Sequence, residues 1–439
     1  MVCGVGEPLL LFASPLPIYR RPGTRERRRR DLFMRFVAAA LLLLAACAPE
    51  AAPPAACCTA TITAVVPAGA PAVYLTGNLA GLGPWRPDAL LMEGEGSERV
   101  ARVTAPRGSV LEYKFTLGSW EREALGPSGM VMANFRLAME DNVSARHEIV
   151  DFKKDVKEYI ADWKGSGVKG TLRYWTDVAS RFLSEKRHVS IWLPPGYDQD
   201  TERRYKVLYM SDGQNLFDPR IANTGVDWGV DEALTALVEE GAIEPVIVVG
   251  VWSSAMRGPE YSPWHRAPDY ARFLIEELMP RVNAEYRTLT GPPNTAHMGS
   301  SMGGLLSFYL ATKHAETFGA CGCISTHLPL SEAVAARYFP MGEGDKAPGA
   351  APDETPYVLK DLDAGLTIPR GARFWFDYGT QGLDADYAPL HAKLRAALIE
   401  KGLVEDDDFV IRAYEGADHN ETSWRARLKD PLRFLYGKG

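Results

Sequence analysis

Residues 295–312 read Thr-Ala-His-Met-Gly-Ser-Ser-Met-Gly-Gly-Leu-Leu-Ser-Phe-Tyr-Leu-Ala-Thr, and they carry the strongest indication of the fold class in this chain. Its first four residues form a short apolar run that is typical of a strand, and its last eight residues are typical of a helix. Between them, Gly299 and Gly303 flank Ser301 in the pattern G-x-S-x-G, which places a serine on a sharp turn between strand and helix. Glycine on both sides lets the chain turn without Cβ clashes.

Ser301 is therefore the candidate nucleophile. Ser300 is the weaker candidate, because its own frame lacks the flanking glycines. A helix that begins directly after the serine turns its first N–H groups, and the positive end of its dipole, toward an oxyanion that forms there. A glycine-rich turn with an incidental serine is the alternative interpretation.

From about Thr171 onward, apolar runs of four to seven residues alternate with helical stretches. The stretches 270–282 and 387–402 repeat their apolar residues at helical spacing. Strands that alternate with helices predict an α/β domain over 171–439, with a mostly parallel sheet covered by helices on both faces. The expected strands are 205–210, 245–251, 295–298, 318–324, 373–376 and 409–414.

His419 is the candidate base for Ser301. A serine hydroxyl is a poor nucleophile until a base takes its proton. In chains with this kind of serine turn, an acid and then a histidine follow the serine in the sequence. His419 lies on a glycine-containing loop directly after the strand 409–414, which is where such a base is delivered.

Three other histidines follow Ser301 and are weaker candidates. His314 ends the helix after Ser301 among polar residues, so we expect it to be solvated. His391 lies beside a lysine on the helix 387–402, where we expect a surface position. His327 follows the strand 318–324 and is a candidate for lining a substrate pocket.

The acid that orients the histidine should follow the preceding strand. The loop after that strand offers Asp384 and Asp386, and Asp377 lies at the strand end. Asp384 is preferred because it ends the loop and precedes the helix. Asp386 stays open as the alternative, and helix capping is the expected role of whichever carboxylate is spare. The acid has to accept the Nδ1–H of the imidazole and stabilise the imidazolium.

The oxyanion hole should take one N–H from the residue after the nucleophile, which is Met302. A second N–H should come from the loop after an earlier strand. Residues 211–217 form such a loop after the strand 205–210, and Gln214 is the candidate donor. A plain β-turn is the alternative for this loop.

Residues 59–150 have a different pattern from the rest of the chain. Short alternating runs such as 61–66, 72–76, 99–103 and 111–117 are separated by clusters of Gly, Pro and Asp. This pattern predicts a small all-β sandwich. Residues 151–170 form a polar connector that is expected to contain a helix before the break at Gly165-Ser-Gly.

Residues 1–58 are interpreted as a leader and tether. An arginine-rich segment precedes Met34, an alternative start of translation, and the apolar run 36–46 ends at Cys47. The run is too short to span a bilayer but has the size of a signal-peptide core. Leu44-Ala45-Ala46-Cys47 resembles a bacterial lipobox, which implies a lipid on Cys47 and export to the cell envelope. A plain secretory signal is the alternative.

Composition limits the classes of partner. The formal net charge of the 439-residue chain is −7, with no large basic face once the leader is removed, which argues against nucleic acid. Neither Cys57-Cys58 nor Cys321-x-Cys323 has the spacing of a zinc site. We expect Cys321 and Cys323 to be buried thiols on one side of a strand. We expect no metal and no organic cofactor.

The region from about Thr171 to Tyr436 resembles the putative esterase family, which includes esterase D, enterobactin esterases, and feruloyl or acetyl-xylan esterases. The resemblance implies an α/β-hydrolase fold, ester hydrolysis through an acyl-enzyme, and the roles of Ser301, Asp384 and His419. Arg257, Glu260 and His327 are candidates for substrate contacts. The loop before Asp384 is longer than the family's usual Gly-Thr-Glu-Asp run, so Asp386 stays open. The motifs that carry the resemblance are 209–217, 257–261, 299–304, 378–384 and 416–421.

The N-terminal sandwich resembles starch-binding modules. Residues 77–85 and 112–121 are similar to the two aromatic sugar platforms of those modules. The resemblance implies that Trp85 and Trp120 stack on sugar rings while Lys114 binds a hydroxyl. Core tryptophans are the alternative explanation.

These observations favour an exported, lipid-anchored serine hydrolase of carboxylic esters, with acylated sugars or a siderophore as the expected substrates. A polysaccharide partner and a membrane contact through the lipid are expected as well. Two other functions stay open: a non-catalytic glycan-binding or scaffolding protein on a hydrolase fold, and an acyltransferase that uses an alcohol in place of water.

Overall fold

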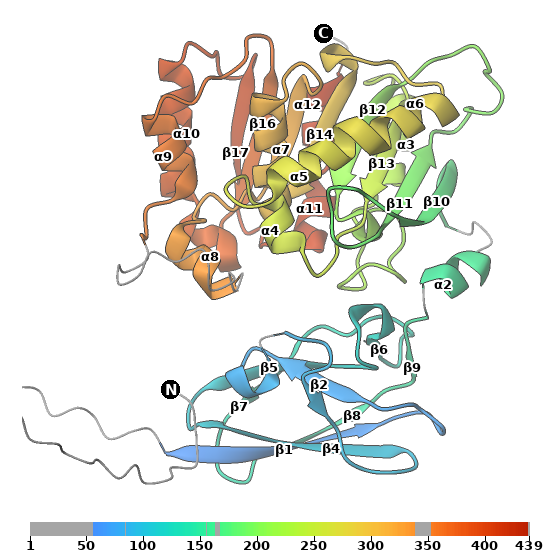
Figure 1. Cartoon of the computed structure of the whole chain (residues 1–439), viewed down its shortest axis with the longest axis vertical. Coiled ribbons are helices and arrows are strands. Elements are labelled where there is room, and N and C mark those ends of the chain that lie inside the picture. Colours follow the sequence, from blue (N-terminus) through green and yellow to red (C-terminus); the bar gives the residue numbers. More distant parts are fainter. Residues whose placement is uncertain (1–55, 84, 155, 163–166, 339–352, 438–439) are drawn as a thin grey trace, which may run out of the picture. The chain divides into compact units, whose positions relative to one another are not determined.

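The computed structural model describes residues 56–83, 85–154, 156–162, 167–338 and 353–437 (Figure 1). The described chain forms two compact units. One unit contains the residues up to Gly118 together with Asn134–Glu148, and the other contains Ser119–Ala133 together with everything from Ile149. The sequence predicted one continuous β domain over 59–150, whereas the stretch 119–133 groups with the second unit. Cys47 lies outside the described residues.

The first unit contains two β-sheets, which have the strand orders β4-β1-β8 and β3-β2-β5-β7. Alternate side chains of β1 and β4 are buried, as expected for strands with one face on a core. The unit is therefore all-β, as the alternating sequence predicted. Its strands are β1 (Cys57–Val65), β2 (Tyr74–Gly77), β3 (Leu90–Leu91), β4 (Glu98–Pro106), β5 (Val110–Thr116), β7 (Phe135–Ala138) and β8 (Ser144–Glu148).

The second unit is built on an eight-stranded sheet with the order β10-β11-β13-β12-β14-β15-β16-β17 (Figure 1). The pairs β10–β11 and β11–β13 are antiparallel, and every neighbouring pair from β13 to β17 is parallel. The predicted mostly parallel sheet is confirmed. The strands are β10 (Thr171–Val178), β11 (Arg187–Leu193), β12 (Lys206–Ser211), β13 (Val246–Val251), β14 (Thr295–Ser300), β15 (Ala320–Ile324), β16 (Arg373–Gly379) and β17 (Phe409–Tyr414).

Helices cover both faces of this sheet, because its strands bury side chains on both sides. Along β12, Val207 and Tyr209 belong to one hydrophobic cluster, and Leu208 and Met210 belong to another. The first cluster includes side chains of α5 to α7 and α10, and the second includes side chains of α3 and α12. The larger helices are α3 (Val230–Glu239), α5 (Ala267–Arg272) continuing through a π-helical turn into α6 (Met279–Glu285), α7 (Met302–Lys313), α10 (Ala388–Glu400) and α12 (Lys429–Tyr436).

Shorter elements complete the second unit. They are β6 (Ala124–Leu125), β9 (Asp151–Phe152), α2 (Val156–Asp162), α4 (Arg257–Tyr261), α8 (Glu332–Tyr338), α9 (Tyr357–Asp363) and α11 (Glu421–Arg427). The α2 helix lies in the predicted connector. Within the described residues, no helix combines the length and the apolar character needed to cross a membrane.

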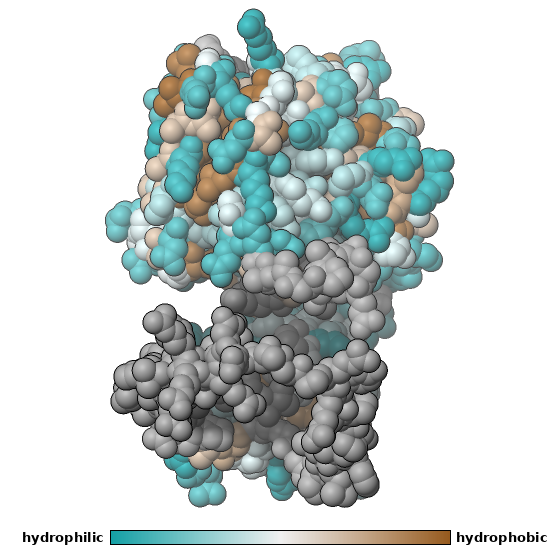
Figure 2. All heavy atoms as spheres, turned by 60° about the vertical axis from the view of Figure 1, so that its left-hand side comes forward, coloured by the Kyte–Doolittle hydropathy of each residue, from teal (hydrophilic) through white to brown (hydrophobic). Residues whose placement is uncertain are grey.

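The face of the second unit in Figure 2 is mostly hydrophilic, and its hydrophobic side chains form small separate areas. Exposed large apolar side chains of this unit include Leu383, Ile399 and Val404. Isolated apolar side chains are ordinary on the surface of a folded protein.

Cys321, Cys323 and His391 are all buried in the second unit. Cys321 and Cys323 in β15 are fully buried, as predicted, with their Sγ atoms 2.8 Å apart. The surface position predicted for His391 is wrong, because the side chain is fully buried in α10. It lies three residues before Leu394 and seven before Leu398, which places it on their inward face. Burial lowers the pKa of His391 to about 4.

Candidate active site

Ser301 lies at the turn between β14 and α7 in a strained backbone conformation. Its φ of 56° and ψ of −118° lie outside the regions that side-chain-bearing residues normally occupy. A Cβ added to Gly299 would lie 2.8 Å from the carbonyl carbon of Gly303, so only glycine permits this approach. The turn thus has the strand–turn–helix form that the G-x-S-x-G pattern predicted.

Two backbone segments border Ser301. Met302 begins α7, and the N–H groups of a first helical turn have no acceptor within their own helix. The end of β12, from which the next loop starts, approaches this helix closely, since a Cβ on Gly303 would lie 3.1 Å from Cβ of Ser211. Gln214 is on this loop, and its side chain is bound to Ser253, at 2.7 Å through Nε2 and 3.1 Å through Oε1. These two bonds fix the side chain of Gln214 against Ser253, and the backbone N–H of Gln214 stays the candidate oxyanion donor.

Arg257 holds the same loop through a paired ion contact. Its Nε and Nη2 donate to the two carboxylate oxygens of Asp212 at 2.8 and 2.7 Å. Asp212 has a left-handed backbone conformation, with φ 54° and ψ 47°, which turns the chain into the Gly213–Asn215 segment. Arg257 is thus paired with Asp212, but its side chain is still 34% exposed. A contact between Arg257 and substrate stays a prediction.

His419 and Asp384 are joined by a hydrogen bond of 2.6 Å between Nδ1 and Oδ1. The second oxygen of Asp384 accepts from the backbone N–H of Gly379 at 2.7 Å and from the hydroxyl of Ser325 at 2.5 Å. Burial alone would raise the pKa of Asp384, but the hydrogen bonds from His419, Ser325 and Gly379 outweigh it and hold the pKa below the ordinary value. Asp384 is therefore an ionised acceptor beneath the imidazole.

The other two carboxylates weighed for this role lie elsewhere. Asp386 is exposed, two residues beyond the fully buried Asp384. Asp377 is buried in β16 and accepts from Arg427 and from the indole N–H of Trp375. The geometry therefore favours Asp384.

A close contact between the loops after β16 and β17 brings Asp384 and His419 together. A Cβ added to Gly379 would lie 2.1 Å from the carbonyl oxygen of Ala417, so the loop after β16 reaches the loop after β17 only because glycine is present. The same carbonyl accepts the backbone N–H groups of Thr380 and Gln381, both at 3.0 Å. Since β14, β16 and β17 are parallel, Ser301, Asp384 and His419 all lie at the same edge of the sheet.

His327 lies beside the nucleophile. Its backbone N–H donates to the carbonyl of Ser301 at 3.2 Å, and its Nδ1 lies 2.7 Å from the hydroxyl of Tyr387. Burial, and then the nearby His419 and Arg257, lower the pKa of His327 to about 4, so the ring is neutral at neutral pH. The predicted pocket-lining role fits this position and stays a prediction.

The hydroxyl of Ser301 makes no hydrogen bond to any described residue, and the structure contains no hydrogen bond between Ser301 and His419. Such contacts are often long in proteins without substrate and tighten when substrate binds.

Sequence reasoning missed three side chains at this site. Ser325 follows β15 and touches Asp384, and both Trp424 and Arg427 donate to the Ser325 hydroxyl. Their positions in the sequence could have indicated them. Ser325 is the first polar residue after a buried strand at the edge that carries Ser301, and the helix that carries Trp424 and Arg427 begins directly after His419 and Asn420.

Glu260 does not have the predicted substrate role. It is 1% exposed, and both of its carboxylate oxygens accept from Arg187 Nη2 at 2.5 Å. Arg187 is itself 1% exposed. Because almost none of its surface is exposed, Glu260 is out of reach of a ligand in this structure, and its pair with Arg187 anchors α4 to β11.

The residues predicted to bind sugar are only partly exposed. Trp85 and Trp120 are each half-buried, and Trp85 has a positive φ of 60°. Lys114 lies on β5 and is also half-buried. Trp85 and Lys114 belong to the first unit, whereas Trp120 lies in the stretch that groups with the second. Sugar binding stays a prediction.

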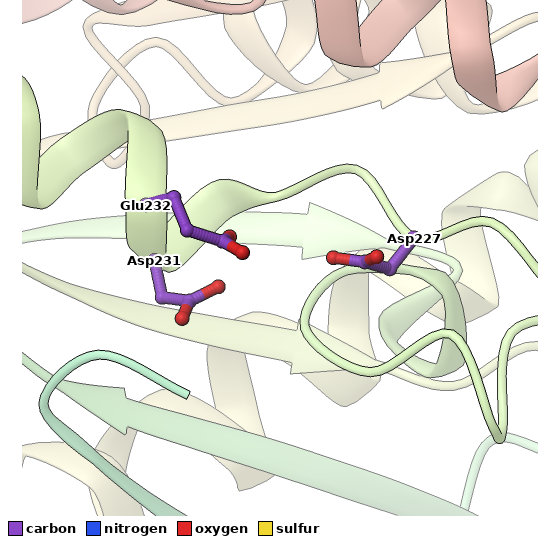
Figure 3. Close-up of side chains that lie close together, drawn as sticks. All are labelled: Asp227, Asp231 and Glu232. Atoms are coloured by element: carbon purple, nitrogen blue, oxygen red, sulfur yellow. The ribbon is translucent and has the colours of Figure 1, made fainter. Parts of the chain in front are cut away.

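One acidic cluster has donor atoms close enough for a cation. Figure 3 shows Asp231 and Glu232 on the first turn of α3 and Asp227 on the loop before it, with their carboxylates near one another. Arg425 already spans Asp227 and Glu232, at 2.6 and 3.1 Å. Burial first, and then Glu232, raise the pKa of Asp231 to about 8, so it keeps its proton at neutral pH. Arg425 and this proton therefore leave one net negative charge on the three carboxylates, and Arg425 occupies the space between Asp227 and Glu232.

Comparison with known proteins gives relatives for the second unit. A family model described as "Putative esterase" matches residues 180–435. The uncharacterized protein YbbA of Bacillus subtilis (strain 168) is 23% identical over 278 residues, which cover 59% of this chain and 96% of YbbA. An endo-1,4-beta-xylanase/feruloyl esterase of Xylanibacter ruminicola is 26% identical over 196 residues, which cover 40% of this chain and only 24% of that protein. The crystal structure of an enterobactin esterase from Shigella flexneri is 16% identical, covers 85% of this chain and 92% of its own, and has a TM-score of 0.46.

Proposed function

We propose that this chain, which belongs to the putative esterase family and is a carboxylic ester hydrolase, uses Ser301 as nucleophile, His419 as base and Asp384 as the group that orients the base. The family match spans more than half of the chain and includes all three residues. The single observation that carries the assignment is the 2.6 Å bond between His419 Nδ1 and Asp384 Oδ1 at the sheet edge where the strained Ser301 lies.

The chemistry follows from the proton positions. An ionised Asp384 can only accept, so the neutral imidazole of His419 carries its proton on Nδ1 and leaves Nε2 as the base. Ser301 Oγ attacks the acyl carbon while Nε2 takes the hydroxyl proton. The proton then goes to the leaving alcohol as the C–O bond breaks, and an acyl-enzyme remains. Water attacks this ester in the same way and releases the acid and free Ser301.

The oxyanion of each tetrahedral intermediate needs fixed donors. We assign this role to the backbone N–H groups of Met302 and Gln214. Support comes from the position of Met302 at the start of α7 and from the clamp between Arg257 and Asp212, which fixes the loop that carries Gln214. Preorganised donors of this kind lower the barrier because they need no reorganisation as charge develops.

Acylated carbohydrates or siderophore esters are the proposed substrates. The relative from Xylanibacter ruminicola is described as a feruloyl esterase, and the structure from Shigella flexneri as an enterobactin esterase. A partly exposed Arg257 and a neutral His327 beside Ser301 are available to bind polar groups of such substrates.

The test compares hydrolysis of p-nitrophenyl acetate by the parent and by Ser301→Ala. Turnover by the parent that is lost in a folded variant is the expected result, and feruloyl, acetyl-sugar and siderophore esters are then compared by kcat/KM. A well-folded parent without turnover on any of these esters would instead favour the glycan-binding or scaffolding alternative. An alcohol acceptor that diverts the acyl group away from water would favour the acyltransferase alternative.

Envelope anchoring through Cys47 and sugar binding by the N-terminal unit are separate proposals. Cys47→Ala should release the protein from the membrane fraction of the producing bacterium. Trp85→Ala should weaken binding to insoluble polysaccharide. An unchanged distribution in either experiment would contradict the corresponding proposal.

A further inference from the structure

Ser325 sits directly beneath the acid of the site. It follows β15, is fully buried and has a positive φ of 39°. Its hydroxyl oxygen lies 2.5 Å from Asp384 Oδ2, 3.0 Å from Trp424 Nε1 and 2.7 Å from Arg427 Nη2. Three polar partners thus surround one hydroxyl group in the interior.

The chemistry of these partners fixes the direction of each hydrogen bond. An indole nitrogen and a guanidinium nitrogen can only donate, and a hydroxyl has one proton and two lone pairs. Trp424 and Arg427 therefore use both lone pairs of Ser325. The single proton of the hydroxyl is left for Asp384, so Ser325 can only donate to it.

The same reasoning extends to Asp384. Its Oδ2 receives the Ser325 hydroxyl and the backbone N–H of Gly379, neither of which can accept a proton there. A proton on Asp384 would have to sit on Oδ1, facing His419, and would force the imidazole proton onto Nε2. The donors at Oδ2 favour the ionised acid and oppose this reversed arrangement.

Arg427 holds Ser325 in place through a second buried carboxylate. Its side chain is 3% exposed, and its Nε and Nη2 donate to Asp377 Oδ1 at 3.2 and 2.9 Å. Asp377 also accepts the backbone N–H of Ser325 at 3.0 Å and the indole N–H of Trp375 at 2.8 Å. Arg427 Nη2 lies 4.0 Å from Asp384 Oδ2, so its charge also favours the ionised acid.

We propose that Ser325, with its hydroxyl proton directed by Arg427 and Trp424, is a positioning residue for ester hydrolysis: it keeps Asp384 an acceptor and thereby keeps the His419 proton on Nδ1. The proposal rests on the proposed function of Ser301, His419 and Asp384. Ser325 itself touches neither substrate nor the reacting atoms, and the buried Arg427–Asp377 pair serves as its anchor.

The kinetic test removes the hydroxyl in two ways. Ser325→Gly suits the positive φ, and Ser325→Ala keeps the Cβ. Both variants should lower kcat by about tenfold and leave KM unchanged, because a hydrogen bond to a charged group is lost at a residue that substrate does not reach. Ser190→Ala is the matched control, since Ser190 is 1% exposed and its hydroxyl accepts the indole N–H of Trp252 at 2.7 Å in β11. This control should lose comparable thermal stability and keep its kcat.

A spectroscopic test does not depend on turnover. In the full-length protein, the Nδ1 proton of His419 should give a strongly downfield proton resonance, which Asp384→Asn identifies by abolishing it. Ser325→Gly should weaken this resonance or shift it upfield, and Ser190→Ala should leave it unchanged. Arg427→Lys keeps the charge but has one nitrogen for two partners, so it should give an intermediate result.

The outcomes separate the positioning role from the proposed function. A parent without esterase activity whose downfield proton still depends on Ser325 would refute the proposed function, while showing that Ser325 does direct the His419 proton to Nδ1. Normal kcat and an unchanged resonance in folded Ser325→Gly and Ser325→Ala would overturn the positioning role. A loss of kcat in Ser190→Ala as large as in the Ser325 variants would overturn it as well.

Discussion

Replacing Asp384 with asparagine keeps the shape of the side chain but turns one carboxylate oxygen into an NH₂ donor. In the native site, Oδ2 accepts from Ser325 and Gly379, and Oδ1 accepts from His419. The amide oxygen of the variant has to face the two donors, because an NH₂ group there would leave both without an acceptor. The amide NH₂ group therefore faces His419.

The expected loss of kcat follows from the imidazole proton of His419, which this change moves to the other ring nitrogen. With a donor facing it, Nδ1 of His419 has to accept, so the imidazole proton moves to Nε2, where the base should be. The wrong tautomer lowers kcat by about 10⁴ in serine hydrolases with such a triad. That factor corresponds to about 5.5 kcal/mol of activation free energy at 25 °C. KM should change little, because Asp384 is fully buried and out of reach of substrate.

The assay measures initial rates of p-nitrophenyl acetate hydrolysis, with folding followed by circular dichroism. Asp386→Asn is the matched control, because this aspartate is exposed and two residues away, and it should keep the parental kcat. A folded Asp384→Asn variant with near-parental kcat would refute the assignment. A collapse of kcat in Asp386→Asn alone would move the orienting role to that residue.

Four further predictions concern the loop clamp, the elbow, the buried histidines and the acidic cluster. Arg257→Ala should lower kcat about 100-fold, because loss of the arginine frees the Asp212 loop that carries Gln214, while a fluorophosphonate should still label Ser301. A parental kcat in this variant would contradict the proposed clamp. Gly299→Ala should lower the free energy of unfolding by about 1–3 kcal/mol in urea titrations, because its Cβ would lie 2.8 Å from Gly303; an unchanged midpoint would argue against the tight elbow. Burial lowers the pKa of His297 to about 3 and of His327 and His391 to about 4, so the unfolded chain binds protons that the folded protein excludes. Asp231 acts in the opposite direction, because its raised pKa keeps a proton in the folded protein that the unfolded chain has released. The three histidines outnumber it, so the free energy of unfolding should still fall as pH drops from the ordinary histidine pKa of about 6.5 toward 4, by roughly 1.4 kcal/mol per pH unit for each net proton taken up; equal stability at pH 7 and pH 5 would contradict this. Neither EDTA nor Ca²⁺ should shift Tm, because Arg425 occupies the Asp227–Glu232 cluster; a rise with Ca²⁺ would show that a cation displaces it.

The part of the site that depends on local sequence could be predicted. The turn at Ser301 is encoded by adjacent glycines, and the alternation of apolar runs with helices encodes the parallel sheet. In such a sheet, loops after neighbouring strands meet at one edge, so the order of Ser301, Asp384 and His419 implied their proximity. Asp384 and Asp386 lie on one short loop, so the sequence could not show that the first is buried and the second is exposed.

The buried residues that hold Asp384, namely Ser325 and Arg427, could not be predicted. Ser325 and Arg427 are 102 residues apart and belong to a strand end and a helix, so no spacing rule connects them. Polar residues that form buried networks look like surface residues in a sequence. The same ambiguity explains His391, whose spacing fits the inward face of α10 although its type suggested the surface. It also explains Glu260, which is buried because Arg187 balances its charge.

Covalent labelling with a fluorophosphonate, followed by peptide mass spectrometry, tests directly whether Ser301 is a nucleophile that His419 activates. We expect one label per chain on Ser301, no label in Ser301→Ala and much slower labelling in His419→Ala, because Nε2 of His419 activates the hydroxyl. A label on Ser300 or on another residue, or equal labelling rates with and without His419, would contradict these two assignments.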